Sequence, residues 1–315
     1  RKPKRKFPNM AIFVRSHIID NKVIDLFNIL RSSIFDTFLL VDVSNRPFPV
    51  NGPSVVAHSI KMCQDDLRLC PNSPGYNYLW FFGDYPIYCA YELKPGYDFY
   101  LQIEYDVHFT RGNALYVEGL AHRLYGDASD QGDLDLAGSR YQKAADTWIW
   151  SAAAKRMFPE VYSVFFPFIC LSAESIKYLL EMRRLEVKEN KNKPEYIHCE
   201  AFVASALKTS GKFSCLDLND IIANSYDPHT FRAGEPMFLG AGLAAEKPVE
   251  MLHPVLDAEG YVRKLCDFSR RTGSTDHLRH AMLDEMVPEK RRSILSSTSI
   301  ALKKSDVLIS HRKAE

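Results

Sequence analysis

Several features that define common protein classes are missing from this sequence. No apolar run approaches the roughly 20 residues that a membrane-spanning helix requires, and the first residues contain no apolar signal-peptide core. The chain has 7 Cys but no CxxC pattern, which argues against a disulfide framework. Net charge is only +1 at pH 7, so no global field favours nucleic acid as a partner. We therefore expect a cytoplasmic protein with free thiols and no nucleic-acid partner.

The short motifs of several large enzyme classes are also missing. None of GxxxxGK[ST], GxGxxG, GxSxG and HExxH occurs in the sequence. Their absence argues against P-loop NTPases, classical dinucleotide enzymes, α/β-hydrolases and zincins. No internal repeat or low-complexity block is present either. Hydrophobic residues make up 46% of the chain and charged residues 25%, which is an ordinary globular balance.

What the first half does contain is an alternation of apolar strand patterns with helical patterns. We expect strands at 10–15, 36–43 and 98–109, and helices at about 23–30, 54–69 and 84–93. The second half is expected to be more helical, with helices at about 135–158, 172–189 and 198–210. Strands that alternate with helices predict an α/β fold with a mainly parallel central sheet, whose ligands gather at the carboxyl ends of its strands.

The two ends of the chain are basic. Five of the first six residues are Lys or Arg, and basic residues recur beyond residue 290. We therefore expect a flexible tail at 1–9, one domain at 10–260 and a helical, basic appendage at 261–315. The basic ends leave two interpretations open. They are either solvated tails or segments that an anionic membrane surface attracts, which would place the protein peripherally at the inner membrane face.

The strand expected at 98–109 carries the most informative pattern. Side chains alternate across a strand, so Gln102, Glu104, Asp106 and His108 would share one face. In a buried parallel strand such ionisable groups are costly without a partner, and a bound cation would offset that cost. Carboxylate oxygens suit Mg²⁺ or Mn²⁺, and substrate phosphates often complete the coordination sphere of these ions. An exposed or edge strand would produce the same alternation, so both interpretations stay open.

The run from Phe99 to Val107 resembles the strand that leads into the DxD motif of GT-A glycosyltransferases, with Glu104-Tyr105-Asp106 in place of the motif. The resemblance implies a GT-A-like domain that uses Mn²⁺ or Mg²⁺ and a nucleotide-sugar donor, with a UDP-sugar favoured. It implies that Asp106 binds the metal directly and that Glu104 contacts the donor ribose or the metal through water. His108 departs from the usual pattern. Three interpretations of this residue stay open: a further metal ligand, a phosphate contact or a residue at the rim of the site.

Two further segments match the GT-A pattern in order along the chain. Glu200 stands ahead of an apolar helical run, where inverting enzymes of this type place the base that deprotonates the acceptor. The alternative is an ordinary first-turn acid, which the helix dipole favours. His253, in Met-Leu-His-Pro-Val, resembles the C-terminal metal-binding histidine of many GT-A enzymes. A purely structural histidine is the alternative there.

Three other residues are expected near the donor. Arg15 ends the first strand and Asp42 lies near the end of the second, where a GT-A fold binds the base and ribose. Asp84 precedes a helix, either as a donor contact or as an N-cap with Pro86 in the first turn. The aromatic runs at 148–150 and 165–168 are either core or surfaces on which acceptor sugars stack.

The resulting prediction is a metal-dependent, inverting glycosyltransferase. It would transfer a sugar from a nucleotide diphosphate to a glycan or glycolipid acceptor, in the synthesis of a surface polysaccharide. One alternative is a metal-dependent nucleotidyl- or phosphotransferase, which also needs paired carboxylates. The other is a non-catalytic α/β scaffold whose polar strand face binds a partner.

Overall fold

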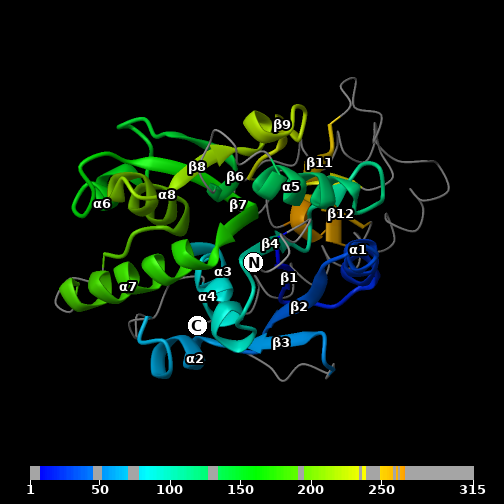
Figure 1. Ribbon diagram of the computed structural model, residues 1–315, viewed down its shortest axis with the longest axis horizontal. Coiled ribbons are helices and arrows are strands. Elements are labelled where there is room, and N and C mark those ends of the chain that lie inside the picture. Colours follow the sequence, from blue (N-terminus) through cyan, green and yellow to red (C-terminus); the bar gives the residue numbers. More distant parts are fainter. Residues whose placement is uncertain are drawn as a thin grey trace, which may run out of the picture.

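Strands and helices alternate along the first half of the chain (Figure 1). This is a computed structural model, and it describes residues 8–44, 52–69, 78–126, 134–190, 195–233, 236–238, 249–257, 260–261 and 263–266. The strands are β1 (Met10–Ser16), β2 (Asp36–Asp42), β3 (Val55–His58), β4 (Phe99–Glu104), β5 (His108–Phe109), β6 (Leu134–Lys143), β7 (Tyr162–Ser172), β8 (Ser214–Asp217), β9 (Tyr226–Phe231), β10 (Met237–Phe238), β11 (Met251–His253) and β12 (Val255–Leu256). The helices are α1 (Asn21–Arg31), α2 (Ile60–Asp65), α3 (Tyr78–Phe81), α4 (Tyr85–Leu93), α5 (Leu115–Gly126), α6 (Ser151–Ala154), α7 (Ala173–Glu189), α8 (Cys199–Ser210) and α9 (Leu218–Ile221).

A seven-stranded sheet in the order β3-β2-β1-β4-β7-β6-β8 forms the centre of the molecule. Strand β7 runs antiparallel to both of its neighbours, β4 and β6, while the other pairings in this sheet are parallel. Strands β4 and β6 therefore point the same way. The mainly parallel α/β fold that the sequence predicts is confirmed.

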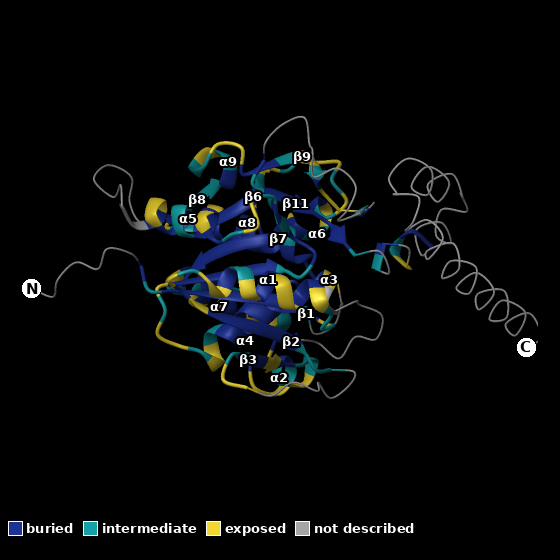
Figure 2. Cartoon of the chain, turned by 90° about the vertical axis from the view of Figure 1, so that its right-hand side faces the viewer, coloured by how far each residue is buried: buried dark blue, intermediate teal, exposed yellow. Residues whose placement is uncertain are grey.

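The sheet is buried on both faces (Figure 2). On β1, Ala11 and Phe13 pack into one hydrophobic cluster, while Ile12 and Val14 pack into another on the opposite face. The first cluster includes residues of α4, α7 and α8, and the second includes residues of α1 and α5. Because both faces are covered, the strands read as nearly continuous apolar runs, which is what made β1 and β2 recognisable in the sequence.

Two expected helices are wrong. The range 54–69 begins with strand β3 and only then forms the short helix α2, because Val55 and Val56 are β-branched and pair with β2. The range 135–158 begins with strand β6, and only Ser151–Ala154 is helical within it. Its Ala and Leu residues favour helix locally, but pairing with β7 and β8 overrides that propensity.

The strand expected at 98–109 is also shorter than predicted. Strand β4 ends at Glu104, and a turn closed by a hydrogen bond from the Val107 N–H to the Glu104 carbonyl (3.1 Å) contains Asp106. Glu104 and Asp106 therefore do not share a strand face. Their side chains still meet, for the reason given in the next section.

No disulfide joins two of the cysteines that the structure describes. Cys63, Cys89, Cys170, Cys199 and Cys266 are buried, and Cys215 is partly exposed. Among the helices that the structure describes, none is both long and apolar enough to cross a membrane. The basic tail expected at 1–9 lies almost wholly outside the described residues, and so does most of the appendage expected from 261 onward.

Candidate metal and donor site

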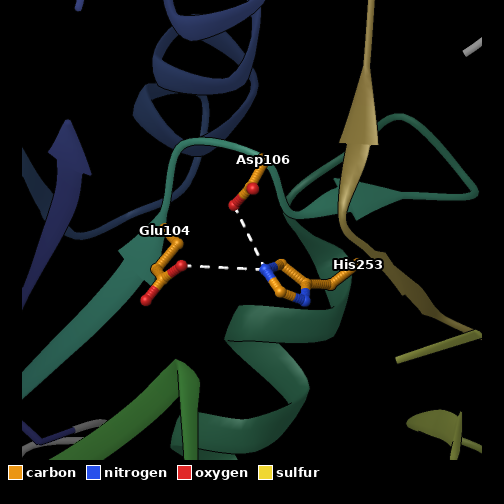
Figure 3. A group of neighbouring side chains, drawn as sticks. All are labelled: Glu104, Asp106 and His253. Atoms are coloured by element: carbon orange, nitrogen blue, oxygen red, sulfur yellow. Dashed lines mark ion pairs between the residues drawn. The ribbon is translucent and has the colours of Figure 1, made fainter. Parts of the chain in front are cut away.

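Glu104, Asp106 and His253 converge on one point (Figure 3). Each offers one ligand atom, and these atoms all lie within 4.8 Å of one another. The imidazole Nε2 of His253 lies 3.2 Å from Asp106 Oδ1 and 3.7 Å from Glu104 Oε2. Asp106 and His253 are buried, and Glu104 is partly exposed. The structure thus brings together all three residues that the sequence predicted as metal ligands.

Backbone pairing between distant segments brings His253 to the two acids. Strand β11, which ends at His253, pairs antiparallel with β5 immediately after the Asp106 turn. The N–H of Val255 donates to the Asp106 carbonyl (2.8 Å), and the N–H of Thr110 donates to the Glu250 carbonyl (3.0 Å). These contacts hold the C-terminal segment against the turn. The end of β4 with Glu104, the turn with Asp106 and the end of β11 with His253 therefore meet.

Opposite charges dominate the electrostatics of the three side chains. Burial works against a charge on the His253 ring, but Asp106 and Glu104 outweigh it and raise its pKa to about 9. Burial also opposes ionisation of Asp106, yet His253, Lys264 and Lys22 together hold its pKa well below the usual range. Without a bound metal, the imidazole therefore carries a proton and its charge helps to balance the two carboxylates.

The donor set fits a divalent metal. Carboxylate oxygens and an imidazole nitrogen are ligands that Mn²⁺ accepts. His253 Nδ1 lies 3.0 Å from the Arg232 carbonyl, and donation of the ring N–H to that carbonyl leaves Nε2 as the ligand atom facing the acids. Asp106 Oδ1 is buried, and within the described part of the chain it makes an ion pair with His253 Nε2 (3.2 Å) but no further hydrogen bond. This contact leaves lone pairs of the oxygen unused, and coordination of a metal would use them.

Arg15 lies at the carboxyl end of β1, beside Glu104. Its guanidinium bonds the Glu104 carboxylate and donates to the Gly83 carbonyl (2.9 Å). Gln102 Nε2 donates to the same carbonyl (3.1 Å). A Cβ on Gly83 would lie 2.9 Å from Arg15 Nη1 and 3.1 Å from Cys199 Sγ, so a larger residue there would displace the Arg15 guanidinium. Arg15 thus orients Glu104, and its expected contact with a donor stays a prediction.

Glu200 also belongs to this region. It lies in the first turn of α8, whose N-cap residue His198 accepts a hydrogen bond from the Glu200 N–H at Nδ1 (3.3 Å). Burial and then the charge of Glu104 raise the pKa of its carboxyl to about 8, while Arg140 and His253 act in the opposite direction. These influences place the carboxyl near the three converging side chains. A carboxyl with such a pKa can exchange a proton near neutral pH.

An aromatic group adjoins Glu200. Trp150 stacks on the His198 ring with centroids 4.4 Å apart, and Trp80 contacts the Trp150 ring at 5.6 Å while 56% of its surface stays exposed. The sequence did not single out Trp80. Phe166 and Phe168 are core residues, so an acceptor role is wrong for them, whereas a role of Trp150 in stacking on an acceptor sugar stays a prediction.

Asp84 does not face a ligand. Its side chain is fully buried, and Arg183 donates to Oδ2 from Nε (2.7 Å) and to Oδ1 from Nη2 (3.0 Å). Tyr88 adds a third hydrogen bond to Oδ2 (2.9 Å). The expected donor contact is therefore wrong. The alternative is confirmed in position, because Asp84 is the N-cap residue of α4 and Pro86 lies in the first turn, but its side chain makes no cap hydrogen bond.

Asp42 and His108 stay outside the converging group. Asp42 ends β2 at the same edge of the sheet as Arg15, where its Oδ1 accepts from the Ser44 N–H (2.9 Å) and hydroxyl (2.5 Å). Its role toward a donor stays a prediction. His108 lies in β5 and pairs with Leu252. It is not one of the three residues whose ligand atoms converge.

Sequence reasoning missed three cations around the site. Lys22 Nζ donates to the Tyr105 carbonyl (2.8 Å), and Lys264 Nζ lies 3.6 Å from Asp106 Oδ2. Lys264 thus contacts the site from beyond the domain boundary expected at 260. Arg140 acts on Glu200 from β6. Lys22 begins a helix and Arg140 sits in a strand predicted to be helical, so neither stood out in the local pattern.

Comparison with known proteins leaves the family open. No family model and no curated protein matches the chain. Among solved structures, the galactosyltransferase LgtC, in complex with donor and acceptor sugar analogues, has 12% identity and a TM-score of 0.43 over 90% of this chain and 99% of that one. A glycosyltransferase involved in glycosylation of the major capsid of PBCV-1 has 11% identity and a TM-score of 0.37, over 78% and 92%. Glucosyl-3-phosphoglycerate synthase from Mycobacterium tuberculosis, in complex with Mn²⁺ and UDP, has 10% identity and a TM-score of 0.34, over 67% and 70%. All are glycosyltransferases, but likeness at these levels carries no argument by itself.

Proposed function

We propose that this chain is a metal-dependent glycosyltransferase of the GT-A type. It would transfer a sugar from a nucleotide diphosphate, with UDP the favoured nucleotide, to a hydroxyl of a glycan or glycolipid. The observation that carries the proposal is the convergence of Glu104, Asp106 and His253 at the carboxyl edge of a mainly parallel sheet. That edge is where ligands bind in such sheets.

The three converging residues would hold Mn²⁺ or Mg²⁺. When bound there, the metal would neutralise the negative charge that develops on the departing nucleoside diphosphate. Lys22 and Lys264, both close to Asp106, add positive charge on the side where that diphosphate would lie. Arg15 holds the Glu104 carboxylate in place, so that it cannot turn away from the site.

Glu200 would act as the general base. Its carboxylate would accept the proton of the acceptor hydroxyl as that oxygen attacks the anomeric carbon from the face opposite the leaving group, which inverts the configuration. The burial that raises its pKa to about 8 makes the ionised carboxylate a better base than an exposed glutamate. Trp80 and Trp150, beside the N-terminus of α8, offer apolar ring faces for the acceptor.

A scaffold without catalysis is the strongest rival, because His253 already balances the two acids without a metal. Calorimetric titration with UDP, GDP and CDP, each with and without Mn²⁺, separates the two. We expect one nucleotide to bind only with metal and Asp106→Ala to abolish that binding. His108→Ala is the matched control and should bind normally. Failure of every nucleotide to bind with Mn²⁺ would favour the scaffold.

The reaction type needs a second measurement. A nucleotidyl- or phosphotransferase would leave a phosphate-linked product, whereas a glycosyltransferase leaves a glycoside and a free nucleoside diphosphate. Product analysis by mass spectrometry after incubation with the nucleotide sugar distinguishes them. The role in a surface polysaccharide, the cytoplasmic location and the peripheral membrane contact stay predictions, since the basic ends lie largely outside the described residues.

A further inference from the structure

Arg140 has an unusual backbone conformation for a residue inside a strand. Its φ is +55°, in the left-handed region that residues other than glycine seldom adopt. The pairing between β6 and β7 shifts register on both sides of Ser139, so the strand bulges at this point. Bulges of this kind redirect a side chain, and strained residues of this kind concentrate at functional sites.

The bulge is held firmly by two residues from other segments. The N–H of Arg140 donates to the phenolic oxygen of Tyr226 (2.7 Å), and the N–H of Tyr141 donates to Asp217 Oδ2 (2.9 Å). Tyr226 in turn donates its hydroxyl proton to the same Asp217 oxygen (2.7 Å). The backbone donors that the bulge frees are thus satisfied, and the backbone at Arg140 is held in place.

The topology places Arg140 at the edge of the sheet that carries the site. Strands β4 and β6 are parallel, so Arg140, near the carboxyl end of β6, lies at the same edge as Glu104. Ser139 pairs with Phe165, whose ring contacts the His253 ring at 5.4 Å. The guanidinium is also close enough to Glu200 for its positive charge to lower the pKa of that carboxyl.

Within the part of the chain that the structure describes, the guanidinium forms no ion pair, although its charge acts on Glu200. The other cations of the site are arranged differently. Lys22 and Lys264 act on Asp106, where the donor diphosphate would lie, whereas Arg140 acts on Glu200, where the acceptor hydroxyl would lie. The positive charges are thus divided between the two proposed substrates.

We propose that Arg140 binds an oxyanion of the acceptor, a phosphate or a carboxylate that lies close to the hydroxyl receiving the sugar. The planar guanidinium matches both groups through paired N–H donors. The acceptor would therefore be an acidic glycan or a phosphate-bearing molecule rather than a neutral sugar. This inference rests on the proposed function for the identity of the acceptor, but not for the existence of the anion site.

The test is a calorimetric titration with inorganic phosphate and, separately, with glucuronate. The protein is first saturated with UDP and Mg²⁺ so that the diphosphate position is filled, and each titration is repeated without nucleotide. We expect wild-type protein to bind at least one probe, and Arg140→Gln to weaken that affinity by at least about tenfold. Arg68→Gln is the matched control, because Arg68 is exposed and also has a positive φ of 59°. It should bind like wild type.

Arg140→Gly separates binding from folding. Glycine adopts the left-handed conformation without strain, so the melting temperature should stay the same or rise while the probe affinity falls as in Arg140→Gln. A clear fall in melting temperature would show that Arg140 is a structural residue and would overturn the proposal. So would unchanged probe affinity in both variants, or no binding of either probe by the wild type.

The donor is the other source of oxyanions, and a third titration addresses it. The affinity for UDP with Mg²⁺ should be the same in wild type and Arg140→Gly. An equal loss of UDP and phosphate affinity would assign Arg140 to the donor diphosphate and overturn the acceptor assignment. If neither the wild type nor the Arg140→Gly variant binds UDP, the proposed function has failed. Arg140-dependent phosphate binding in the absence of nucleotide would then still establish the anion site.

Discussion

The Nε2 atom of His253 lies 3.2 Å from Oδ1 of Asp106, although the two residues belong to widely separated segments of the chain. The contact needs no other ion, because a protonated imidazole balances the buried carboxylate. We propose that the same two atoms would be metal ligands once that proton leaves. One arrangement would then serve both states, and binding of a metal would displace a proton rather than require the chain to reorganise.

Manganese should stabilise the folded protein. A ligand that binds only the folded state adds about 2.7 kcal/mol at a concentration 100 times its dissociation constant, so Mn²⁺ should raise the melting temperature by several degrees and EDTA should reverse the effect. Differential scanning fluorimetry measures the shift. It should be absent in Asp106→Asn and retained in His108→Gln. A shift of equal size in Asp106→Asn would mean that the metal binds elsewhere.

Glu200→Gln should abolish sugar transfer while leaving metal-dependent nucleotide binding intact. Loss of a general base typically costs about 100- to 10,000-fold in rate. The measurement is the release of the nucleoside diphosphate from whichever donor the titrations identify. Glu174→Gln is the matched control, because Glu174 is also a first-turn acid but is exposed on α7. Nearly normal activity in Glu200→Gln would remove Glu200 from the mechanism.

The pH dependence gives a second view of Glu200. Since only the ionised form accepts a proton and its pKa is about 8, kcat/KM should rise with pH and level off above that value. Arg140→Gln removes a nearby positive charge and should move the rise to higher pH. A profile that is flat between pH 6 and 9, or one that does not respond to Arg140→Gln, contradicts this picture.

Arg183 should be among the most sensitive positions for stability. It is fully buried between Asp84 and Glu186, and it also donates to the Ile197 carbonyl (2.9 Å) just before α8. Arg183→Met would leave two buried carboxylates without their cation, at a cost of about 3–5 kcal/mol. Urea denaturation checks this. Arg184→Met, one residue along on the exposed face, should cost less than about 1 kcal/mol, and equal losses would contradict the argument.

Two buried histidines should each lower the stability of the protein in mild acid. Burial lowers the pKa of His58 to about 4 and that of His198 to about 3, so both stay neutral in the folded state while the unfolded chain takes up protons below about 6.5. Their joint contribution should be level above that pH and should remove on the order of 3 kcal/mol of stability by pH 5.5. His253 and Glu200, whose pKa values are raised to about 9 and about 8, act in the opposite direction, so the contribution of the two buried histidines is measured by comparing variants with wild type.

Denaturation midpoints of wild type and variants at pH 7.5 and 5.5 measure each contribution. Relative to its own value at pH 7.5, the midpoint at pH 5.5 should be higher in His58→Gln and in His198→Gln than in wild type, because each variant removes one of the groups that the unfolded state protonates. His229→Gln is the matched control, since His229 is exposed on β9. An unchanged difference in both buried variants would mean that other groups set the acid stability.

Tyr226→Phe should loosen the bulge that carries Arg140. The substitution leaves the Arg140 N–H without its acceptor and Asp217 without one donor, which costs about 1–3 kcal/mol. It should also weaken phosphate binding, because the backbone at Arg140 is no longer held in place. Tyr162→Phe is the control, since no side-chain hydrogen bond of its hydroxyl is seen in the described residues. Equal stability of the two variants would argue against the bulge being held in this way.

Some of the site was readable from local pattern. Strands β1 and β2 were predicted nearly to the residue because both faces of the sheet are buried and the apolar runs are continuous. Helix α8 was predicted from the apolar run that follows Glu200. The grouping of Glu104, Asp106 and His253 was also predicted, but the stated reason for two of them was wrong. They meet across a turn and not along one strand face.

The sequence by itself determined which segments are apolar enough to be buried strands and where acids interrupt them, because those are properties of neighbouring residues. Only the tertiary structure decided that Asp84 pairs with Arg183, that residues 134–143 are a strand, and that the charge of Arg140 acts on Glu200. Each of these depends on which distant segment lies alongside. Burial and strand pairing between distant parts of the chain set those outcomes, and neither is encoded in local periodicity.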